Sequence, residues 1–395
     1  TSNALLLDNN ANNLIYFNHG TANFNGTVSG AITVRAWDGT DGATSGTLNT
    51  TTTVTGGTSP SAYSADTSVS LAISAVNDAP TGMGNTTIPA VLEDTADPAG
   101  VAISALTSLS FSDVDAGSGL GGIAVVGNTA NAGTEGVWEY SSDGTNWQAI
   151  GTVADGATAR ALASTTKLRF VPVANFNGTP TGLTVRALDD TYVAGFTTWD
   201  GTTETVVNVD TTTPGGATAI ASATNTIGTS ITAVNDAPTT TGAGVTLTNV
   251  VEDNVTSVGD AVSSLVSNIS DVDGGAVKGI AIYATDTANG AWEYTINDGG
   301  LWTSVGVVSG TSALLLRGDD ANTKLRFVPA TNYNGTATVS FYAWDQTTNT
   351  SAANGTKVDV STRGTTTEFS TTSENATVTV TPVNDAPTQS ATGNT

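Results

Sequence analysis

The sequence contains no cysteine, and His19 is its only histidine. Without cysteine, disulfide bonds cannot stabilise the chain, so any stapling of an extracellular fold must come from elsewhere. A single histidine argues against a Ser-His-Asp triad, against zinc sites built from histidine and cysteine, and against histidine-based acid–base catalysis. Much of the familiar chemistry of enzymes is therefore disfavoured from the start.

Basic residues are also scarce. Lysine and arginine total 11 against 35 acidic residues, which gives a formal net charge of −24. Nucleic acids and anionic membranes attract Lys and Arg, so we expect this chain to bind neither. No apolar run approaches the ~18 residues of a membrane-spanning helix, so we expect no membrane insertion. The acidic residues must serve either as solvating surface charge or as ligands for a hard cation.

Charged side chains make up only 12% of the chain, about half of the ~25% that is usual in globular proteins. Thr, Ser, Asn and Gly largely replace them. Thr and Val favour the half-buried surface of a sheet, whereas Asn and Gly favour the turns that join strands. With 38% hydrophobic residues the chain can still form ordinary cores. This composition predicts an all-β fold of many short strands.

The main signal is an internal repeat. The phrase Val-Asn-Asp-Ala-Pro-Thr begins at Val76, Val234 and Val383, at intervals of about 150 residues, which indicates a tandem array. Further landmarks recur in the same order in two successive units. They are Glu93-Asp94 with Glu252-Asp253, Asp113-Val114-Asp115 with Asp271-Val272-Asp273, Trp138-Glu139-Tyr140 with Trp292-Glu293-Tyr294, Leu168-Arg169-Phe170 with Leu325-Arg326-Phe327, Asn175-Phe176-Asn177-Gly178 with Asn332-Tyr333-Asn334-Gly335, and Arg186-Ala187-Leu188-Asp189 with Tyr342-Ala343-Trp344-Asp345.

These matches place complete repeats at 79–236 and 237–385 and the start of a further repeat at 386–395. Residues 1–78 match only the C-terminal half of a unit, because Ala4-Leu5-Leu6-Leu7 aligns with Ala313-Leu314-Leu315-Leu316. Half a sandwich cannot bury a core. We therefore expect the natural polypeptide to continue in both directions.

Local patterns predict the elements within a unit. Residues 167–171 and 181–187 alternate with a period of two, which predicts strands. The Asn-Gly pairs at 177–178 and 334–335 predict tight turns. Apolar residues recur at helical spacing over 258–269, and more weakly over 101–109, which predicts one short helix in each repeat.

The Asn-Asp-Ala-Pro phrase, the Glu-Asp pair that follows it, the Asp-x-Asp motif and the Ala-x-Asp that ends a strand together resemble cadherin repeats. The sequence is most similar to the cadherin-like repeats of giant bacterial adhesins and RTX-type secreted proteins, which carry the same Asn-Phe-Asn-Gly-Thr and Val-Asn-Asp-Ala-Pro-Thr phrases. The resemblance covers nearly the whole chain. It implies tandem Greek-key β-sandwiches, of the cadherin and immunoglobulin-like kind, with Ca²⁺ at the junctions.

The residues also suit calcium in their own right. Ca²⁺ takes six to eight oxygen ligands, and Asp-x-Asp places two carboxylates on one side of a loop. In a Greek-key sandwich the entering linker and two loops share one end, so their acids should meet. The alternative is that Asp-x-Asp and Asn-Asp merely form turns. The expected ligands are Asn77, Asp78, Asp113, Asp115 and Asp189 at the first junction, Asn235, Asp236, Asp271, Asp273 and Asp345 with Glu93 or Asp94 at the second, and Glu252, Asn384 and Asp385 in a half-site at the tail.

Two other patterns have structural interpretations. Carboxylate pairs can hydrolyse sugars, but acids that recur in every unit fit structural ligands better than one active site, so we expect no enzyme activity. Arg317-Gly318-Asp319 spells the integrin-binding tripeptide. It occurs once and the preceding unit has no counterpart, so we interpret it as an ordinary turn.

Four tryptophans, Trp138, Trp147, Trp292 and Trp302, recur at equivalent places. We interpret them as aromatic side chains of a Trp-Glu-Tyr hairpin packed over the core. The alternative is a sugar-stacking platform, which would make the chain an array of carbohydrate-binding modules. Exposure distinguishes the two, because stacking requires open indole faces.

We therefore predict structural extender, or stalk, repeats of a large secreted bacterial cell-surface adhesin, rigidified by calcium at the junctions between repeats. Besides carbohydrate-binding modules, the alternative is a subunit of an extracellular sheath, filament or S-layer. The expected location is extracellular, at the bacterial cell surface. The expected partners are neighbouring repeats of the same polypeptide and, through lateral self-association, further copies of it.

Overall fold

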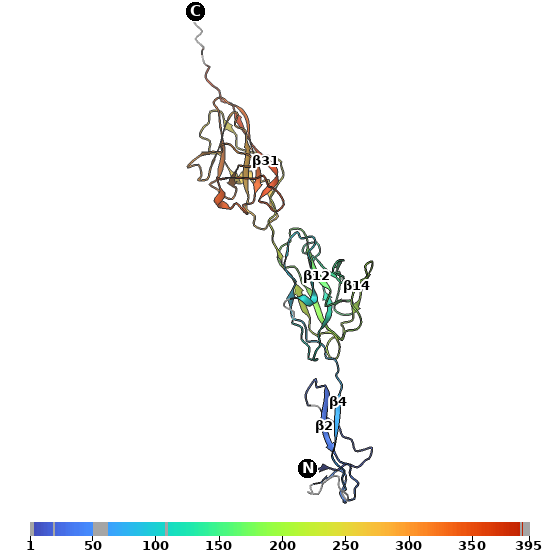
Figure 1. Ribbon diagram of the computed structural model, residues 1–395. Helices are drawn as coiled ribbons and strands as arrows, with labels where there is room; N and C mark the ends of the chain where they lie inside the picture. The colour runs from blue at the N-terminus through green and yellow to red at the C-terminus, as the bar shows by residue number, and fades with distance from the viewer. Residues whose placement is uncertain (1–3, 19, 50–61, 107–109, 388, 390–395) are drawn as a thin grey trace, which may run out of the picture. The chain divides into compact units, whose positions relative to one another are not determined.

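A computed structural model of the chain describes residues 4–18, 20–49, 62–106, 110–387 and 389 (Figure 1). The chain divides into two compact units. The first comprises Thr1–Val91, Thr95–Val173 and Thr179–Ser230, and the second comprises Leu92–Asp94, Ala174–Gly178 and Ile231–Thr395. Two further short strands are β6 (Val91–Leu92) and β18 (Ile231–Thr232).

The described residues between Ala4 and Ile73 contain two small two-stranded sheets (blue in Figure 1). β1 (Ala4–Leu5) pairs antiparallel with β3 (Leu48–Asn49), and β2 (Gly26–Val34) pairs antiparallel with β4 (Thr67–Ile73). Leu6 and Tyr63 form a small buried cluster there. Most apolar side chains of β2 and β4 remain exposed.

Residues 79–230 form a sandwich of two sheets, with strand orders β10-β9-β12-β7 and β16-β11-β8-β13-β17-β5. Neighbouring strands are antiparallel except β5, which runs parallel to β17. A hairpin of β14 (Thr198–Trp199) and β15 (Glu204–Thr205) is added to this sandwich. The strands are β5 (Thr86–Thr87), β7 (Val101–Ala102), β8 (Leu120–Gly127), β9 (Gly136–Ser141), β10 (Gln148–Ala149), β11 (Ala159–Ala163), β12 (Lys167–Pro172), β13 (Leu183–Asp189), β16 (Asn208–Val209) and β17 (Asn225–Gly228).

The second unit contains the corresponding sandwich, with strand orders β22-β28-β25-β26 and β20-β31-β29-β24-β27-β30. β21 (Val250–Val251) also pairs with β31, and β19 (Thr239–Thr240) pairs with β23 (Ile269–Ser270). The other strands are β20 (Val245–Thr246), β22 (Asp260–Ala261), β24 (Gly279–Thr285), β25 (Gly290–Thr295), β26 (Thr303–Ser304), β27 (Ala313–Arg317), β28 (Lys324–Pro329), β29 (Gly335–Trp344), β30 (Lys357–Val358) and β31 (Phe369–Thr381).

The strand order identifies both sandwiches as Greek keys. In the second unit β22-β28-β25 and β31-β29-β24 reproduce the B-E-D and G-F-C orders of an immunoglobulin-type sandwich. One core joins its two sheets, since Trp292 and Phe327 pack with Ile280, Phe341 and Val378, each 2% exposed or less. The predicted all-β, Greek-key fold is confirmed.

Each sandwich contains one helical turn where the sequence predicts a helix. These turns are the 3₁₀ turn η1 (Ile103–Ala105) and the helix α1 (Val262–Leu265). The second sandwich also has a 3₁₀ turn, η2 (Ser351–Ala353), that the sequence did not predict. The helical spacing over 258–269 overstates the helix, because Val258 is 79% exposed and Asp260–Ala261 is a strand. Residues 107–109 of the weaker pattern lie outside the described residues.

The turn prediction at the Asn-Gly pairs is wrong. The chain reverses two or three residues earlier, at 174–175 and 331–332, where Asn175 (φ 59°) and Asn332 (φ 58°) adopt the left-handed conformation. Gly178 instead forms a bridge with Ile231, and Gly335 begins β29. The second asparagine of each phrase, Asn177 or Asn334, therefore does not form the turn, and its side chain can hydrogen-bond elsewhere.

Candidate metal centre

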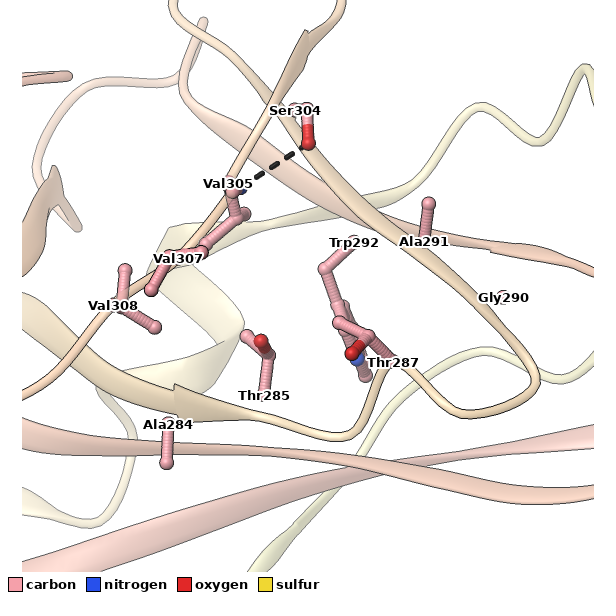
Figure 2. A pocket seen from close by; sticks show the side chains of 11 residues that line it. Ala284, Thr285, Thr287, Gly290, Ala291, Trp292, Ser304, Val305, Val307 and Val308 are labelled. Atoms are coloured by element: carbon pink, nitrogen blue, oxygen red, sulfur yellow. Dashed lines mark hydrogen bonds between the residues drawn. The ribbon is translucent and has the colours of Figure 1, made fainter.

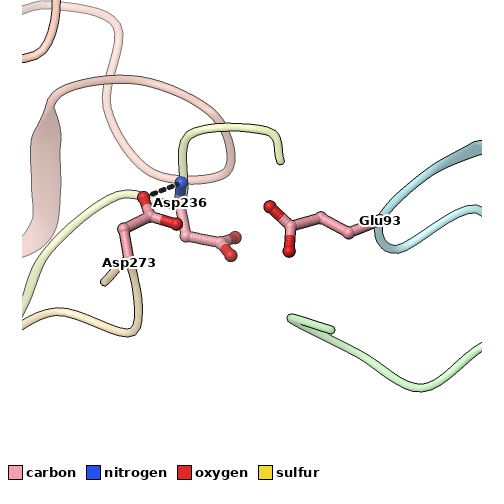
Figure 3. Close-up of side chains that lie close together, drawn as sticks. All are labelled: Glu93, Asp236 and Asp273. Atoms are coloured by element: carbon pink, nitrogen blue, oxygen red, sulfur yellow. Dashed lines mark hydrogen bonds between the residues drawn. The ribbon is translucent and has the colours of Figure 1, made fainter. Parts of the chain in front are cut away.

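Three carboxylates of the second unit converge (Figure 3). One oxygen from each of Glu93, Asp236 and Asp273 lies within 4.8 Å of the other two. Glu93 follows β6, Asp236 lies in the linker before β19, and Asp273 lies in the loop after β23. The backbone N–H of Asp236 donates to Asp273 Oδ2 over 2.8 Å, which ties the linker to the Asp-x-Asp loop.

The loop that presents Glu93 is held by the Asn-Phe-Asn-Gly phrase. The Asn177 side-chain amide donates to Glu93 Oε2 over 2.9 Å, and the backbone N–H of Val234 donates to Oε1. Asp94 adopts a left-handed conformation with φ 63°. Its Oδ1 accepts the backbone N–H of Asn175 over 2.8 Å. Of the two acids that the sequence left open, Glu93 joins the group of three, whereas Asp94 holds the loop.

Two carboxyl groups of this arrangement, those of Asp236 and Asp271, have raised pKa values. Burial and then the neighbouring carboxylates, those of Asp94, Asp273 and Glu93 foremost, raise the pKa of Asp236. Burial likewise raises the pKa of Asp271, whose Oδ1 accepts the Asp273 backbone N–H over 2.9 Å. Oδ2 of Asp236 and Oδ2 of Asp271 are buried with no hydrogen-bond partner among the described residues. Buried carboxylate oxygens without donors are costly unless a cation accompanies them.

Asn235 and Asp345 do not belong to the group of three carboxylates, but they hold the linker that carries Asp236. The Asn235 amide donates to Asp345 Oδ2 over 3.0 Å and to the carbonyl of Thr367 over 3.2 Å. The other oxygen of Asp345 accepts the backbone N–H of Thr347 over 2.8 Å. Asp345 is only 4% exposed, so it fixes the position of the linker from inside the sandwich.

The first junction repeats the same bonds. Asp78 N–H donates to Asp115 Oδ2 over 2.7 Å, and Asp115 N–H donates to Asp113 Oδ1 over 2.9 Å. The Asn77 amide donates to Asp189 Oδ2 over 3.2 Å. In the part of the chain that the structure describes, the carboxylates at this end form no group of three with ligand oxygens within 4.8 Å of one another, unlike those of Glu93, Asp236 and Asp273. Residues 1–78 contain no glutamate that could take its place.

Near the C-terminus, Glu252 and its hydrogen-bond donors correspond to Glu93 and its donors. Glu252 is held as Glu93 is, with Oε1 accepting Val383 N–H over 2.6 Å and Oε2 accepting the Asn334 amide over 3.2 Å. Asn384 and Asp385 are exposed. The final segment at 388 and 390–395, which falls within the expected further repeat, lies outside the described residues.

The sequence interpretation missed the asparagines that hold the glutamates. Asn177 and Asn334 belong to a phrase that recurs as strictly as the acids, and that recurrence was the available signal. The Asn-Gly pairs predict turns instead, because Asn-Gly is a strong signal for a short turn. His19, the only histidine, lies outside the described residues.

The tryptophans occupy two kinds of environment. Trp138 and Trp292 are 0% and 1% exposed, and each packs against a phenylalanine, with ring centroids 5.2 Å apart. Trp147 and Trp302 are half-buried beneath guanidinium groups, with Arg169 and Arg326 at 4.1 and 4.0 Å from the ring centroids. The prediction that Trp138 and Trp292 are core residues is confirmed.

A pocket of about 420 Å³ opens beside Trp292 (Figure 2). Its lining residues are uncharged and include Thr285, Ser304 and Val308 beside Trp292. Because the indole of Trp292 is almost wholly covered, the pocket offers no ring face for a sugar to stack on.

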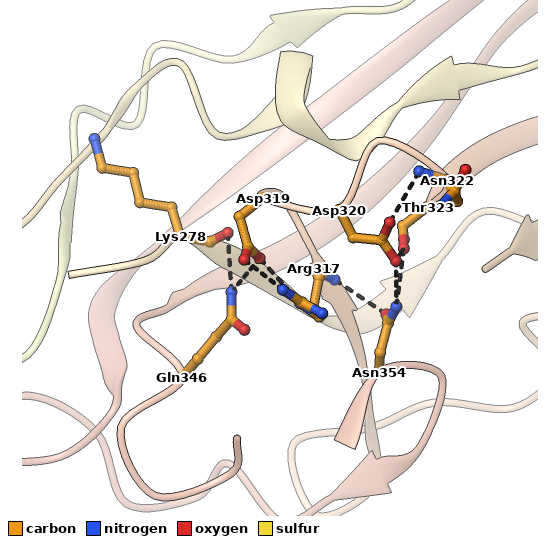
Figure 4. A network of polar contacts seen from close by, with 8 residues as sticks. All are labelled: Lys278, Arg317, Asp319, Asp320, Asn322, Thr323, Gln346 and Asn354. Carbon is orange, nitrogen blue, oxygen red and sulfur yellow. Dashed lines mark hydrogen bonds and ion pairs between the residues drawn. The ribbon is translucent and has the colours of Figure 1, made fainter. Parts of the chain in front are cut away.

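The arginine and aspartate side chains of the Arg-Gly-Asp tripeptide hydrogen-bond to each other (Figure 4). Arg317 Nε donates to Asp319 Oδ1 over 3.0 Å, and Gln346 donates to the same oxygen over 2.8 Å. The hydrogen bond from Arg317 is the main cause that lowers the pKa of Asp319. The two charged side chains of the tripeptide therefore pair with each other at the end of β27.

Comparisons with known proteins give similarity of structure alone. No protein-family model and no curated protein matches the chain. A human mucin-like protocadherin fragment, EC1-2, is 12% identical over 76% of this chain and 98% of its own, with a TM-score of 0.35. Mouse cadherin-23 EC22-24 is 14% identical over 82% of this chain and 72% of its own, with a TM-score of 0.34. The human desmocollin-1 ectodomain is 12% identical over 96% of this chain and 60% of its own, with a TM-score of 0.35.

Proposed function

We propose that this chain consists of extender repeats of a large extracellular adhesin of a bacterial cell surface, and that Ca²⁺ stiffens it between repeats. In this proposal 79–236 and 237–385 are complete repeats, 1–78 is the C-terminal half of another, and 386–395 begins the next. One observation carries the calcium assignment: oxygens of Glu93, Asp236 and Asp273, from three separate segments, lie within 4.8 Å of one another.

The charge of this group supports a divalent cation. Unit negative charges about 4 Å apart repel by ~1–4 kcal/mol per pair, depending on the effective dielectric. None of the ion pairs among the described residues involves Glu93, Asp236 or Asp273. A bound cation would turn the repulsion into attraction and supply a partner for the orphaned oxygens of Asp236 and Asp271.

The donor set supports calcium over smaller or softer metals. The candidate ligand atoms are carboxylate oxygens, because the sequence contains no cysteine and His19 is its only histidine. Ca²⁺ takes six to eight oxygens in flexible geometry, whereas Mg²⁺ demands a near-ideal octahedron and keeps several waters. Three carboxylates, with the carboxylate of Asp271 beside them, therefore suit Ca²⁺ better than Mg²⁺. The expected affinity is that of extracellular modules, about 10⁻⁴–10⁻³ M.

The mechanical role follows from where the ligands lie in the sequence. Glu93 belongs to the repeat at 79–236, Asp236 is the last residue of that repeat, and Asp273 belongs to the repeat at 237–385. An ion held by all three would tie one repeat to the next. Repeats that contact only their neighbours form quasi-one-dimensional arrays, whose stiffness depends on such ties. The partners in this proposal are the neighbouring repeats and, by lateral packing, other copies. None of the described helices is long or apolar enough to cross a membrane.

Isothermal titration of the metal-stripped chain with CaCl₂ tests the assignment. The wild-type chain should give a binding heat that Asp236→Asn with Asp273→Asn abolishes. Asp286→Asn is the matched control, because Asp286 is exposed in the same repeat and lies outside the group. No heat at millimolar calcium, or an unchanged heat in the double variant, would contradict the proposal.

A further inference from the structure

The tripeptide Ala-Asn-Gly occurs twice in the chain, at 288–290 and at 353–355. At an Asn-Gly step the backbone nitrogen of glycine can attack the side-chain amide carbon of asparagine, because glycine has no Cβ to hinder the approach. The attack requires an asparagine side chain that is free to rotate and a glycine N–H that is free of a hydrogen bond. The two tripeptides share one sequence and differ in both requirements.

Asn354 and Gly355 meet neither requirement. Asn354 Oδ1 accepts the backbone N–H of Arg317 over 3.2 Å, and Asn354 Nδ2 donates to Thr323 Oγ1 over 2.9 Å (Figure 4). The N–H of Gly355 donates to the carbonyl of Leu315 over 2.8 Å. Both groups that would react are therefore engaged in hydrogen bonds of their own.

Asn289, in contrast, has a free side chain. It lies in the turn between β24 and β25, and it is exposed. No hydrogen bond joins its side chain to another of the residues that the structure describes. Its main chain is held, since the Asn289 carbonyl accepts the Ala330 N–H over 2.8 Å. The side-chain amide can therefore rotate toward the backbone of the next residue while the main chain stays in place.

The N–H of Gly290 is also free. Gly290 stands opposite Pro329 in the antiparallel ladder of β25 and β28. Because Ala330 bonds to Asn289 one position along, Gly290 and Pro329 form a non-hydrogen-bonded pair, whose N–H groups point away from the partner strand. Gly290 also lines the pocket beside Trp292 (Figure 2), and none of the described residues accepts its N–H. The Gly290 nitrogen is therefore available to react.

The other three Asn-Gly steps of the chain have a glycine that is paired with another segment. The N–H of Gly178 donates to the carbonyl of Ile231 over 2.9 Å. The glycines at the corresponding places are paired within their sheets, Gly26 with Ile73 and Gly335 with Val380. All five Asn-Gly steps lie within the described residues, and the step at 289–290 combines a free side chain with a free N–H.

The fold requires the glycine of this step but not the asparagine. A Cβ at position 290 would lie 2.4 Å from Cζ of Phe327 and 2.4 Å from the carbonyl oxygen of Val328, so only glycine fits. In the first repeat the corresponding Gly136, opposite Pro172, follows Glu135. A glutamate has no amide nitrogen to lose. The reactive step therefore occurs in the second repeat and not in the first.

We propose that Asn289 is a site of spontaneous deamidation in the folded protein. The backbone nitrogen of Gly290 bonds to Cγ of Asn289, the bond from Cγ to Nδ2 breaks, and ammonia leaves with the hydrogen that Gly290 gives up. Water then opens the cyclic imide at either of its carbonyl carbons, which gives aspartate or isoaspartate. Either product adds a carboxylate next to a pocket whose lining residues are uncharged, and isoaspartate adds a methylene to the main chain directly before β25.

Storage of the full chain in mildly alkaline buffer tests the proposal, with Asn354 as an internal control of identical tripeptide sequence. Peptide mapping by mass spectrometry measures the conversion of each asparagine, and chromatography separates the isoaspartate form from the aspartate form. We expect Asn289 to convert at least ~10-fold faster than Asn354, because a hydrogen-bonded step reacts only in molecules that have opened locally. In urea both tripeptides are equally free, and the two rates should converge.

Asn289→Gln is the control variant, because the longer side chain closes to a larger ring far more slowly. It should abolish conversion at position 289 and leave conversion at Asn354 unchanged. Equal rates at Asn289 and Asn354 in the folded chain would overturn the proposal. A lead of Asn289 that persists undiminished in urea would overturn it too, since the local sequence would then set the rate. The same holds if the folded chain keeps Asn289 intact over a time in which the chain in urea converts it.

Discussion

The side-chain amide of Asn177 donates a hydrogen bond of 2.9 Å to Oε2 of Glu93 across 84 positions of the sequence. Asn334 makes the corresponding bond to Glu252. In both places the asparagine fixes the carboxylate while the preceding left-handed asparagine turns the chain. The four-residue Asn-aromatic-Asn-Gly motif therefore both reverses the chain and positions the carboxylate of a glutamate.

Asn177→Ala should weaken calcium binding by about tenfold, because a partner that orients a metal ligand is worth roughly 10–100-fold in affinity. Titration calorimetry on the variant measures this directly. Asn334→Ala removes the equivalent bond at Glu252, which belongs to no carboxylate group among the described residues, and should leave that heat unchanged. Equal losses in both variants would point to a general effect on folding.

Trp292→Ala should destabilise the second unit by about 3–5 kcal/mol, because it opens a cavity in a core where the indole is 1% exposed. Urea unfolding followed by near-ultraviolet circular dichroism measures the change. Trp302→Ala, at the half-buried position beneath Arg326, should cost clearly less. A Trp292→Ala chain that unfolds normally but loses binding on a glycan array would favour the carbohydrate-module alternative.

Arg326→Ala should cost about 2 kcal/mol, the scale of hydrogen bonds to a charged group. Arg326 bonds Glu293 Oε2 at 2.7 Å, covers Trp302 at 4.0 Å and donates to the carbonyl of Ser257. Its side chain is only 12% exposed, so little screening is expected. A double-mutant cycle with Glu293→Gln isolates the ion pair. Strictly additive losses would show that the pair contributes nothing of its own.

Calcium removal should loosen the connection between repeats before it unfolds them. EGTA leaves Glu93, Asp236 and Asp273 with uncompensated charge, so the linker should gain freedom while the cores remain folded. Small-angle scattering should show a broader distribution of interdomain distances, and the first melting transition should move to lower temperature. The same scattering profile and the same melting temperature with and without EGTA would reduce these acids to solvating charge.

Much of this architecture could be predicted from order and spacing. Alternation over 167–171 and 181–187 predicts strands, and the structure has β12 at Lys167–Pro172 and β13 at Leu183–Asp189, which begins two residues later than predicted. The recurrence of Trp138 at Trp292 identifies both as core residues, since equivalent positions in repeated units share their burial. The positions of the Asp-x-Asp loops and of the Glu-Asp pairs follow from the same repeat.

The choice between Glu93 and Asp94 required the tertiary structure. Adjacent acids look alike in a sequence, but the left-handed backbone of Asp94 turns its carboxylate onto the 174–178 loop and leaves Glu93 facing Asp236. The hydrogen bond from Asn177 to Glu93 also required the tertiary structure, because the two residues are distant in the chain. Spacing along one segment determines which face a side chain takes, whereas a site assembled from three segments depends on how their backbones turn and where they meet.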